Sequence, residues 1–177
     1  MLKGERIGLR PLQTEDVWML YGWSNDREVL EDLGRREGFF CTSMEEERKA
    51  VETMLASRNE RHFLMVDLED NKGLGIVSLR DIDERNASAG LRLVVGEKSA
   101  WGKGLVKEAL GLILAFSFRQ LNLHRISVRV PEYSRKMLEC YKSVGFREDG
   151  VLRHDHFHRG KYADSLLLSL LREEFSC

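Results

Sequence analysis

The stretch "SAWGKGLVKEAL", Ser99 to Leu110, places two glycines one residue apart immediately before a run of apolar residues at helical spacing. The residues before it, Ala89 to Val95, alternate in a way that is typical of a strand. A strand, a short loop and a helix N-terminus gather backbone N–H groups at the positive end of a helix dipole, where an anion can bind. On spacing alone, Gly102 and Gly104 either admit a phosphate to these donors or only shape the turn.

The glycine spacing also narrows the kind of ligand. The stretch matches neither the G-x-x-x-x-G-K-[ST] loop of nucleoside triphosphate sites nor the G-x-G-x-x-G turn of Rossmann dinucleotide sites. It therefore argues against both of these nucleotide classes. A pyrophosphate group remains a suitable ligand for the loop.

The composition predicts one compact domain spanning residues 1–177. Hydrophobic residues make up 42% and charged residues 32% of the 177 residues, which is enough apolar material for a sizeable core. The formal net charge of -1 provides no basic field that would attract DNA or RNA. Nucleic-acid binding is therefore not expected.

No segment of the sequence indicates a membrane or a secretory pathway. No run approaches the roughly 20 apolar residues of a membrane span, and Met1 to Arg10 is too charged for a signal peptide. Cys41, Cys140 and Cys177 are far apart in the sequence, which fits reduced thiols better than a disulfide framework. These features predict a cytoplasmic protein without membrane contact.

The rest of the chain alternates between strand and helix patterns without linkers or repeats. Three short helices are predicted near the N-terminus, two of them with the spacing of a capping box, at Asn25 and Glu28 and at Ser43 and Glu46. Strands are predicted at residues 6–12, 62–68, 73–82, 89–95, 124–130, 151–158 and 163–171, with longer helices at 105–122 and 134–144.

Several of these segments together resemble one known family. "AGLRLVVGEKSAWGKGLVKEAL", "LNLHRISVRV", "CYKSVGF" and "GKYADSLLLSLLREEF" are similar to the GNAT superfamily of acetyl-CoA-dependent N-acetyltransferases, and most of all to the branch that acetylates the N-termini of ribosomal proteins. The resemblance runs over almost the whole chain. It implies an α/β (α+β) fold, with a mixed, V-shaped sheet of about seven strands and helices on both faces, and it allows for a homodimer.

The resemblance also implies how acetyl-CoA would bind. Main-chain groups of a strand would pair with the pantetheine arm, and the glycine loop would hold the pyrophosphate, without any metal. Tyr141 falls where many GNAT enzymes place the general acid that protonates the departing thiolate, although its spacing also fits a core aromatic residue. The implied coenzyme-binding residues are Leu93, Val94, Val95, Trp101, Gly102, Lys103, Gly104, Leu105, Val106, Lys107, Ser134, Lys136 and Tyr141.

This chain departs from the family pattern at several of these places. Val106 stands where the family usually has Gly or Ala, and Met137 where it usually has Ser. In the strand before the loop, Gly90 replaces the acidic residue that often acts as the base. The departures keep open a third class of function, a coenzyme-binding module without catalysis.

The missing base bears on the acceptor. A polyamine or lysine amine with a pKa near 10.4 costs roughly 4.6 kcal/mol to deprotonate at pH 7, whereas a protein α-amine near 7.8 costs only about 1 kcal/mol. The sequence therefore favours a protein or peptide N-terminus as acceptor. A polyamine and an aminoglycoside or another small amine remain as alternatives. The candidate substrate-binding residues are Glu28, Glu31, Asp32, Arg92 and His156.

Three histidines alternate in "HDHFH", at His154, His156 and His158. In an extended strand their side chains share one face, which is an arrangement that metal ligands can have. Ligands from a single strand rarely enclose an ion, so we expect no metal and assign these histidines to a substrate cleft or an interface.

Overall fold

The computed structural model describes residues 1–32 and 42–176. Its centre is a single eight-stranded sheet in the order β1-β2-β3-β4-β5-β6-β8-β7. This is one strand more than the sequence patterns predict, because Leu2 and Lys3 pair with the next strand. The strands are β1 (Leu2–Lys3), β2 (Ile7–Pro11), β3 (Arg61–Asp67), β4 (Gly73–Asp83), β5 (Ser88–Val95), β6 (Arg125–Pro131), β7 (Arg147–His158) and β8 (Lys161–Leu171).

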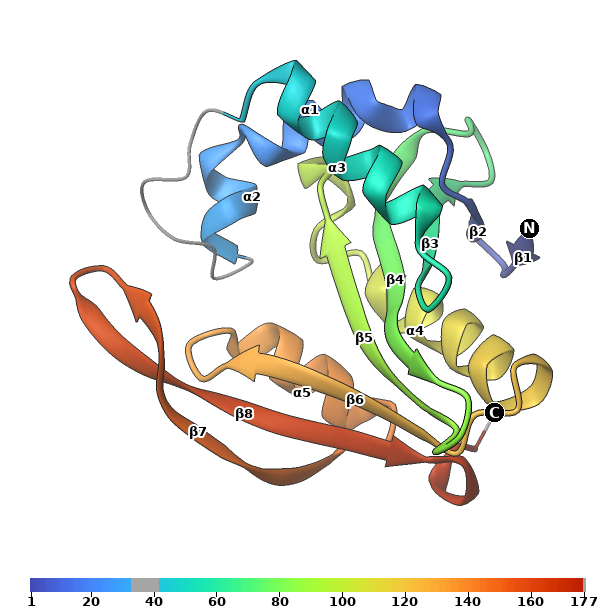
Figure 1. Ribbon diagram of the computed structural model, residues 1–177, viewed down its shortest axis with the longest axis vertical. Coiled ribbons are helices and arrows are strands. Elements are labelled where there is room, and N and C mark those ends of the chain that lie inside the picture. The colour runs from blue at the N-terminus through green and yellow to red at the C-terminus, as the bar shows by residue number, and fades with distance from the viewer. Residues whose placement is uncertain (33–41, 177) are drawn as a thin grey trace.

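Helices cover both faces of this sheet, as Figure 1 shows. Alternate residues of β3 point to opposite faces, so that Met65 packs into the cluster that includes α4 and Leu64 into the cluster that includes α1 and α3. None of the helices in the described part of the chain is long and apolar enough to cross a membrane. The helices are η1 (Thr14–Asp16), α1 (Val17–Ser24), α2 (Arg27–Asp32), α3 (Met44–Ala56), η2 (Lys98–Ala100), α4 (Leu105–Ala115), the π-helix η3 (Phe116–Gln120), α5 (Arg135–Ser143) and η4 (Arg172–Glu174).

The helix starts follow the predicted capping pairs in one case of two. The capping box of α3 is present, because the Ser43 hydroxyl accepts from the Glu46 N–H at 3.2 Å and the Glu46 carboxylate accepts from the Ser43 N–H at 2.8 Å. At α2 the prediction is wrong. There Asp26, not Asn25, accepts from the Glu28 N–H at 3.0 Å, while the Asn25 amide donates to two backbone carbonyls.

The sheet divides between β5 and β6. These two strands are parallel and pair only where Ser88–Gly90 faces Arg125–Ser127, after which they diverge. Figure 1 shows the resulting wedge, which opens between β5 and β6 and gives the sheet its expected V shape. The edge of β5 from residue 91 to residue 95 has no strand partner on the β6 side among the described residues.

The hairpin of β7 and β8 corrects the expectation for the three histidines. The strand register shifts just before His156, and His154 there adopts a φ of 53°. The His154 ring stacks on Tyr162 with a centroid distance of 6.1 Å, and Tyr162 pairs with Phe157, whose side chain alternates with those of His156 and His158. The bulge thus turns His154 to the other face, so the three rings do not share one face.

Candidate active site

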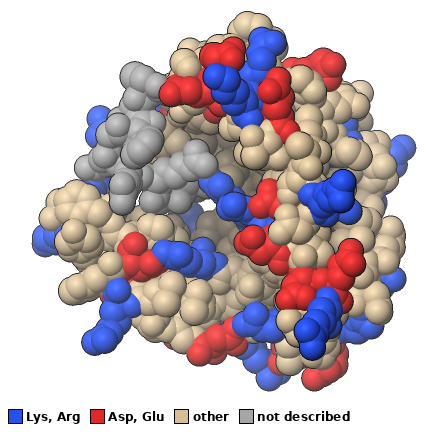
Figure 2. Space-filling model, viewed as in Figure 1, with Lys and Arg blue, Asp and Glu red and all other residues tan. Residues whose placement is uncertain are grey.

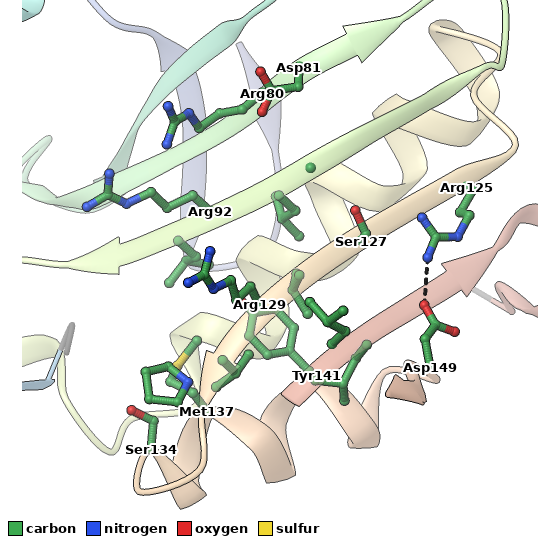
Figure 3. A pocket seen from close by; sticks show the side chains of 18 of the residues that line it. Arg80, Asp81, Arg92, Arg125, Ser127, Arg129, Ser134, Met137, Tyr141 and Asp149 are labelled. Carbon is green, nitrogen blue, oxygen red and sulfur yellow. Dashed lines mark hydrogen bonds and ion pairs between the residues drawn. The ribbon is translucent and has the colours of Figure 1, made fainter. Parts of the chain in front are cut away.

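The wedge between β5 and β6 contains a cleft of about 740 Å³. Arg92 extends into it from β5 and Arg129 from β6, while Met137 and Tyr141 line it from α5 and Ser134 from the N-cap of that helix, as Figure 3 shows. Figure 2 shows that this face of the molecule is hollowed at its centre, with basic and acidic side chains around the hollow. Residues from both arms of the V-shaped sheet therefore line the cleft.

Ion pairs hold most of the arginine side chains that line this cleft. The pairs are Arg80 with Glu60 at 3.2 Å, Arg125 with Asp149 at 2.6 Å, and Arg129 with Asp155. Each pair fixes the position of a guanidinium group and compensates its charge. The cleft is consequently polar without being strongly basic, in spite of its arginines.

His156 lies in the wall of the cleft, as expected for a cleft histidine. Its Nε2 atom is 3.5 Å from the carboxylate of the neighbouring Asp155. Burial lowers the pKa of His156, against the opposing attraction of Asp155. The imidazole is therefore neutral near pH 7.

Tyr141 belongs both to the core and to the wall of the cleft. Its ring is buried in the main core cluster, edge-on to Phe146 with a centroid distance of 5.2 Å, and it also lines the cleft. Burial raises the pKa of Tyr141, so its hydroxyl keeps its proton across the physiological range. A protonated phenol in the cleft wall is a donor available to a developing anion.

The glycine loop before α4 has the backbone geometry that requires glycine. Gly102 has a φ of 73° and Gly104, the N-cap of α4, has a φ of 76°. Residues other than glycine rarely adopt these values. A Cβ atom at either position would meet no protein atom within 4 Å, so the space above the loop is open. The protein leaves open space in front of this loop and the start of α4, as a helix N-terminus that binds an anion requires.

The other predicted coenzyme-binding residues surround this loop in different ways. Val106 packs against the core cluster, so its β-branched side chain is directed inward and does not fill the open space. Lys103 and Lys107 are exposed beside the loop, Lys136 is exposed in the first turn of α5, and Ser134 lines the cleft. Leu93 and Leu105 bury their side chains in the core, so only their main-chain atoms are available, as they are for Val94 and Val95 on the open edge of β5.

A second, smaller cavity of about 220 Å³ lies between the N-terminal helices and the sheet, and Arg92 lines both cavities. Its wall is mostly apolar, with Trp23, Val29 and Met54 among the lining side chains. Glu47 of α3 also lines it and is only 7% exposed. No hydrogen bond or ion pair of the Glu47 side chain is found among the described residues, although its oxygen atoms are not completely buried.

Sequence patterns did not single out Glu47, although they contain a signal for it. Met44, Val51 and Met54 form the apolar stripe of α3, and Glu47 occupies a position within that stripe. A charged residue at a core-facing position of an amphipathic helix is unusual and needs a partner. The carboxylate therefore makes the side cavity a candidate site for a cation.

Glu28, on the acidic helix α2, lies outside both cavities. Lys98 bridges Glu28 at 2.8 Å and Asp26 at 2.9 Å, and Glu28 lines neither cavity. The position of Glu28 therefore gives no support to its predicted role in binding substrate. The side chains of Glu31 and Asp32 lie outside the described part of the structure. No group of three or more described His, Cys, Asp or Glu side chains is placed to hold a metal ion.

Comparisons with known proteins identify the family. Residues 6–147 match the acetyltransferase (GNAT) domain. The SPbeta prophage-derived uncharacterized N-acetyltransferase YokL of Bacillus subtilis is 31% identical over 97% of this chain and 93% of its own length. Spermidine N(1)-acetyltransferase of Vibrio cholerae is 26% identical over 96% of this chain and 95% of its own length.

The fold agrees with a solved structure. Spermidine N-acetyltransferase from Vibrio cholerae, in complex with CoA and spermine, superimposes with a TM-score of 0.88 at 24% identity, over 97% of this chain and 98% of that one. The expected closeness to the ribosomal branch is not confirmed, because the putative ribosomal N-acetyltransferase YdaF of Bacillus subtilis aligns with only 61% of this chain. The family match over most of its length, together with this fold, makes the chain a GNAT-family, acetyl-CoA-dependent N-acetyltransferase.

Proposed function

We propose that the acceptor is a small aliphatic amine that carries a second positive charge, of the polyamine type. The observation that carries this proposal is the buried carboxylate of Glu47 in the apolar side cavity. A buried charge without a counterion is costly, so the cavity favours a ligand that brings a cation. Its apolar wall suits a methylene chain, and the ring of Trp23 offers cation–π attraction.

The curated relatives support the same class of acceptor. Two that match almost the whole chain act, by their names, on spermidine, in Vibrio cholerae and in Escherichia coli. The acceptor favoured by the sequence, a protein or peptide N-terminus, remains the second candidate, because Gly90 in the cleft wall supplies no carboxylate base. Glu47 favours the polyamine, because a simple α-amine carries no second positive charge that could neutralise the Glu47 carboxylate.

In the proposed reaction, acetyl-CoA supplies an acetyl thioester for direct attack by the neutral amine. The N–H groups at Gly102 to Val106 bind the pyrophosphate, with Lys103 and Lys107 adding positive charge from beside the loop. The open edge of β5 at Leu93–Val95 pairs with the pantetheine arm. Tyr141 donates its hydroxyl proton to the departing sulfur, because burial keeps that hydroxyl protonated, and the proton that the nitrogen loses as the amide forms restores the hydroxyl.

The test compares acceptors at one pH. Initial rates with acetyl-CoA are measured for spermidine, n-butylamine, a short peptide with a free N-terminus and an N-terminally blocked peptide containing lysine. We expect spermidine to have the highest kcat/KM. A higher kcat/KM for the peptide with a free N-terminus would contradict the proposal and restore the α-amine as acceptor.

Glu47→Gln isolates the contribution of the carboxylate. We expect it to raise the KM for spermidine at least about tenfold, because it removes one partner of a buried charge pair. The KM for n-butylamine, which has no second charge, is expected to change little. Glu45→Gln on the same helix is the matched control, since Glu45 is exposed and pairs with Lys49 at 3.5 Å. An unchanged KM for spermidine in Glu47→Gln would show that the cavity does not hold its second charge.

A further inference from the structure

A chain of hydrogen bonds runs from the side cavity across β4 and β3 to Glu60, just before β3 begins. The Ser78 hydroxyl lies 2.9 Å from Nδ1 of His62, and Nε2 of His62 lies 3.0 Å from the carboxylate of Glu60. Ser78 and His62 are 16 positions apart in the sequence but directly opposite each other in the register of β3 and β4. The pairing of the two strands thus builds an arrangement of hydroxyl, imidazole and carboxylate.

Burial determines the protonation state of this chain. The His62 side chain is only 5% exposed, and burial lowers its pKa against the opposing attraction of Glu60. Arg80 on β4 and Arg92 on β5 act in the same direction as burial. The imidazole is therefore neutral near pH 7. With Nε2–H donated to the carboxylate of Glu60, Nδ1 is the atom that accepts the hydrogen bond from Ser78.

The outer end of the chain faces the side cavity, which shares Arg92 with the main cleft. Ser78 lines the side cavity together with Glu47 of α3. It is also the cross-strand partner of Arg92, which lines both the side cavity and the main cleft. Gly90, where the family often has an acidic base, lies on the same face of β5 as Arg92. A hydroxyl linked to a neutral imidazole therefore stands near the place where that base is missing.

We propose that Ser78, His62 and Glu60 form a proton relay that deprotonates the acceptor amine. A proton of the acceptor ammonium passes to Oγ of Ser78 as the Ser78 hydroxyl proton passes to Nδ1 of His62. The products of this step are the neutral amine and an imidazolium paired with the Glu60 carboxylate. Glu60, whose side chain is 17% exposed, connects the pair to solvent, where the proton is lost before the next turnover. The relay rests on the proposed acetyl transfer to an amine and supplies the base that this reaction needs.

The relay predicts a specific change in the pH profile. In the parent protein, kcat/KM for spermidine falls on the acid side as His62 takes up a proton. Ser78→Ala and His62→Gln remove the relay, so only acceptor that is already neutral in solution can react. Their kcat/KM at pH 7 is expected to fall about 10²- to 10³-fold and to rise about tenfold per pH unit toward the pKa of the amine, near 10.4.

Two further comparisons separate a relay from a structural role. A peptide α-amine near pKa 7.8 needs less help from a base, so the same variants should lose less activity with it than with spermidine. Ser117→Ala is the matched control for deleting a buried hydroxyl, because Ser117 is fully buried and donates to the carbonyl of Ile113 in the preceding turn, at the end of α4. It should retain the pH profile of the parent.

The outcomes are distinct. If folded Ser78→Ala and His62→Gln keep kcat/KM and its pH dependence within about threefold, the relay is wrong. If His156→Gln shifts the acid limb instead, the base is His156. Should the parent turn over peptides but not spermidine, the proposed acceptor fails, and the same variants are then measured with the peptide. The ¹⁵N shifts of the His62 ring provide a readout without any acceptor, because the relay requires a neutral ring protonated on Nε2 at pH 7.

Discussion

The indole nitrogen of Trp101 donates a hydrogen bond to the carbonyl oxygen of Val95 at 3.1 Å, which fastens the glycine loop to the end of β5. Trp101→Phe keeps an aromatic ring but removes this donor. A hydrogen bond of this kind contributes about 0.5–1.5 kcal/mol, so the Kd for acetyl-CoA should rise about two- to tenfold. Calorimetric titration measures it, and an unchanged Kd would mean that the bond does not position the loop.

Gly104→Val tests the loop more severely. At a φ of 76° a side chain costs roughly 1–2 kcal/mol, and the new methyl groups would occupy the open space in front of the N–H groups. We expect the affinity for acetyl-CoA to fall more than about tenfold. Gly111→Ala in the same helix is the control, because its Cβ atom meets nothing within 4 Å and it should leave binding intact. Equal affinity in folded Gly104→Val would remove the pyrophosphate from this loop.

Tyr141→Phe separates the chemical role of this residue from its packing role. The ring keeps its contact with Phe146, so stability and the Kd for acetyl-CoA should be preserved. Loss of the only donor on the ring should lower kcat about 10²- to 10⁴-fold if Tyr141 protonates the leaving thiolate. The measurement is kcat at saturating acetyl-CoA, and a value within a few-fold of the parent would assign the proton to another donor.

Sequence patterns predicted the order of the elements and the V shape because those depend on local periodicity and on the family resemblance. The glycine loop was recognisable for the same reason, since a left-handed backbone at Gly102 and Gly104 excludes most other residues. The bulge at His154 was not predictable from the sequence, because assigning side chains to alternate faces assumes a regular strand.

Local sequence patterns could not predict the polar groups of the side cavity. His62 and Ser78 meet only through the register of two strands, and register is set by the whole sheet. Glu28 shows the same limit of local patterns in a second way. Its acidic neighbours suggested a cation site, but Lys98, 70 positions away, already pairs with it in the folded chain.

Glu108 provides a test of the support beneath the glycine loop. Its carboxylate accepts from the N–H groups of Glu5, Arg6 and Ile7 at 2.7, 2.9 and 3.3 Å, and Arg6 in turn donates to the carbonyl of Lys103 at 3.2 Å.

Glu108→Ala leaves the three N–H groups without this acceptor and should lower the free energy of unfolding by about 1–3 kcal/mol. The Kd for acetyl-CoA should rise as well, because Arg6 no longer holds the loop. Urea unfolding and titration measure the two effects, with the exposed Glu52→Ala of α3 as control. A stability equal to that of the control would show that the N-terminal turn is not anchored by this carboxylate.

His62 and His156 predict how stability depends on pH. Burial lowers the pKa of both imidazoles below the unfolded value of 6.5, so between the two values the unfolded chain binds more protons than the folded one. Stability should therefore be complete above pH 6.5 and decline as the pH falls from there through the folded-state pKa values. His62→Gln should remove part of that decline, and the double variant with His156→Gln should remove more.

The measurement is urea unfolding at pH 7.5 and pH 5.0, in which each variant is compared with itself, so that a uniform loss of stability does not affect the result. If His62→Gln shows the full decline of the parent, the buried imidazole is not held neutral, and it would be charged when the relay needs it to accept a proton.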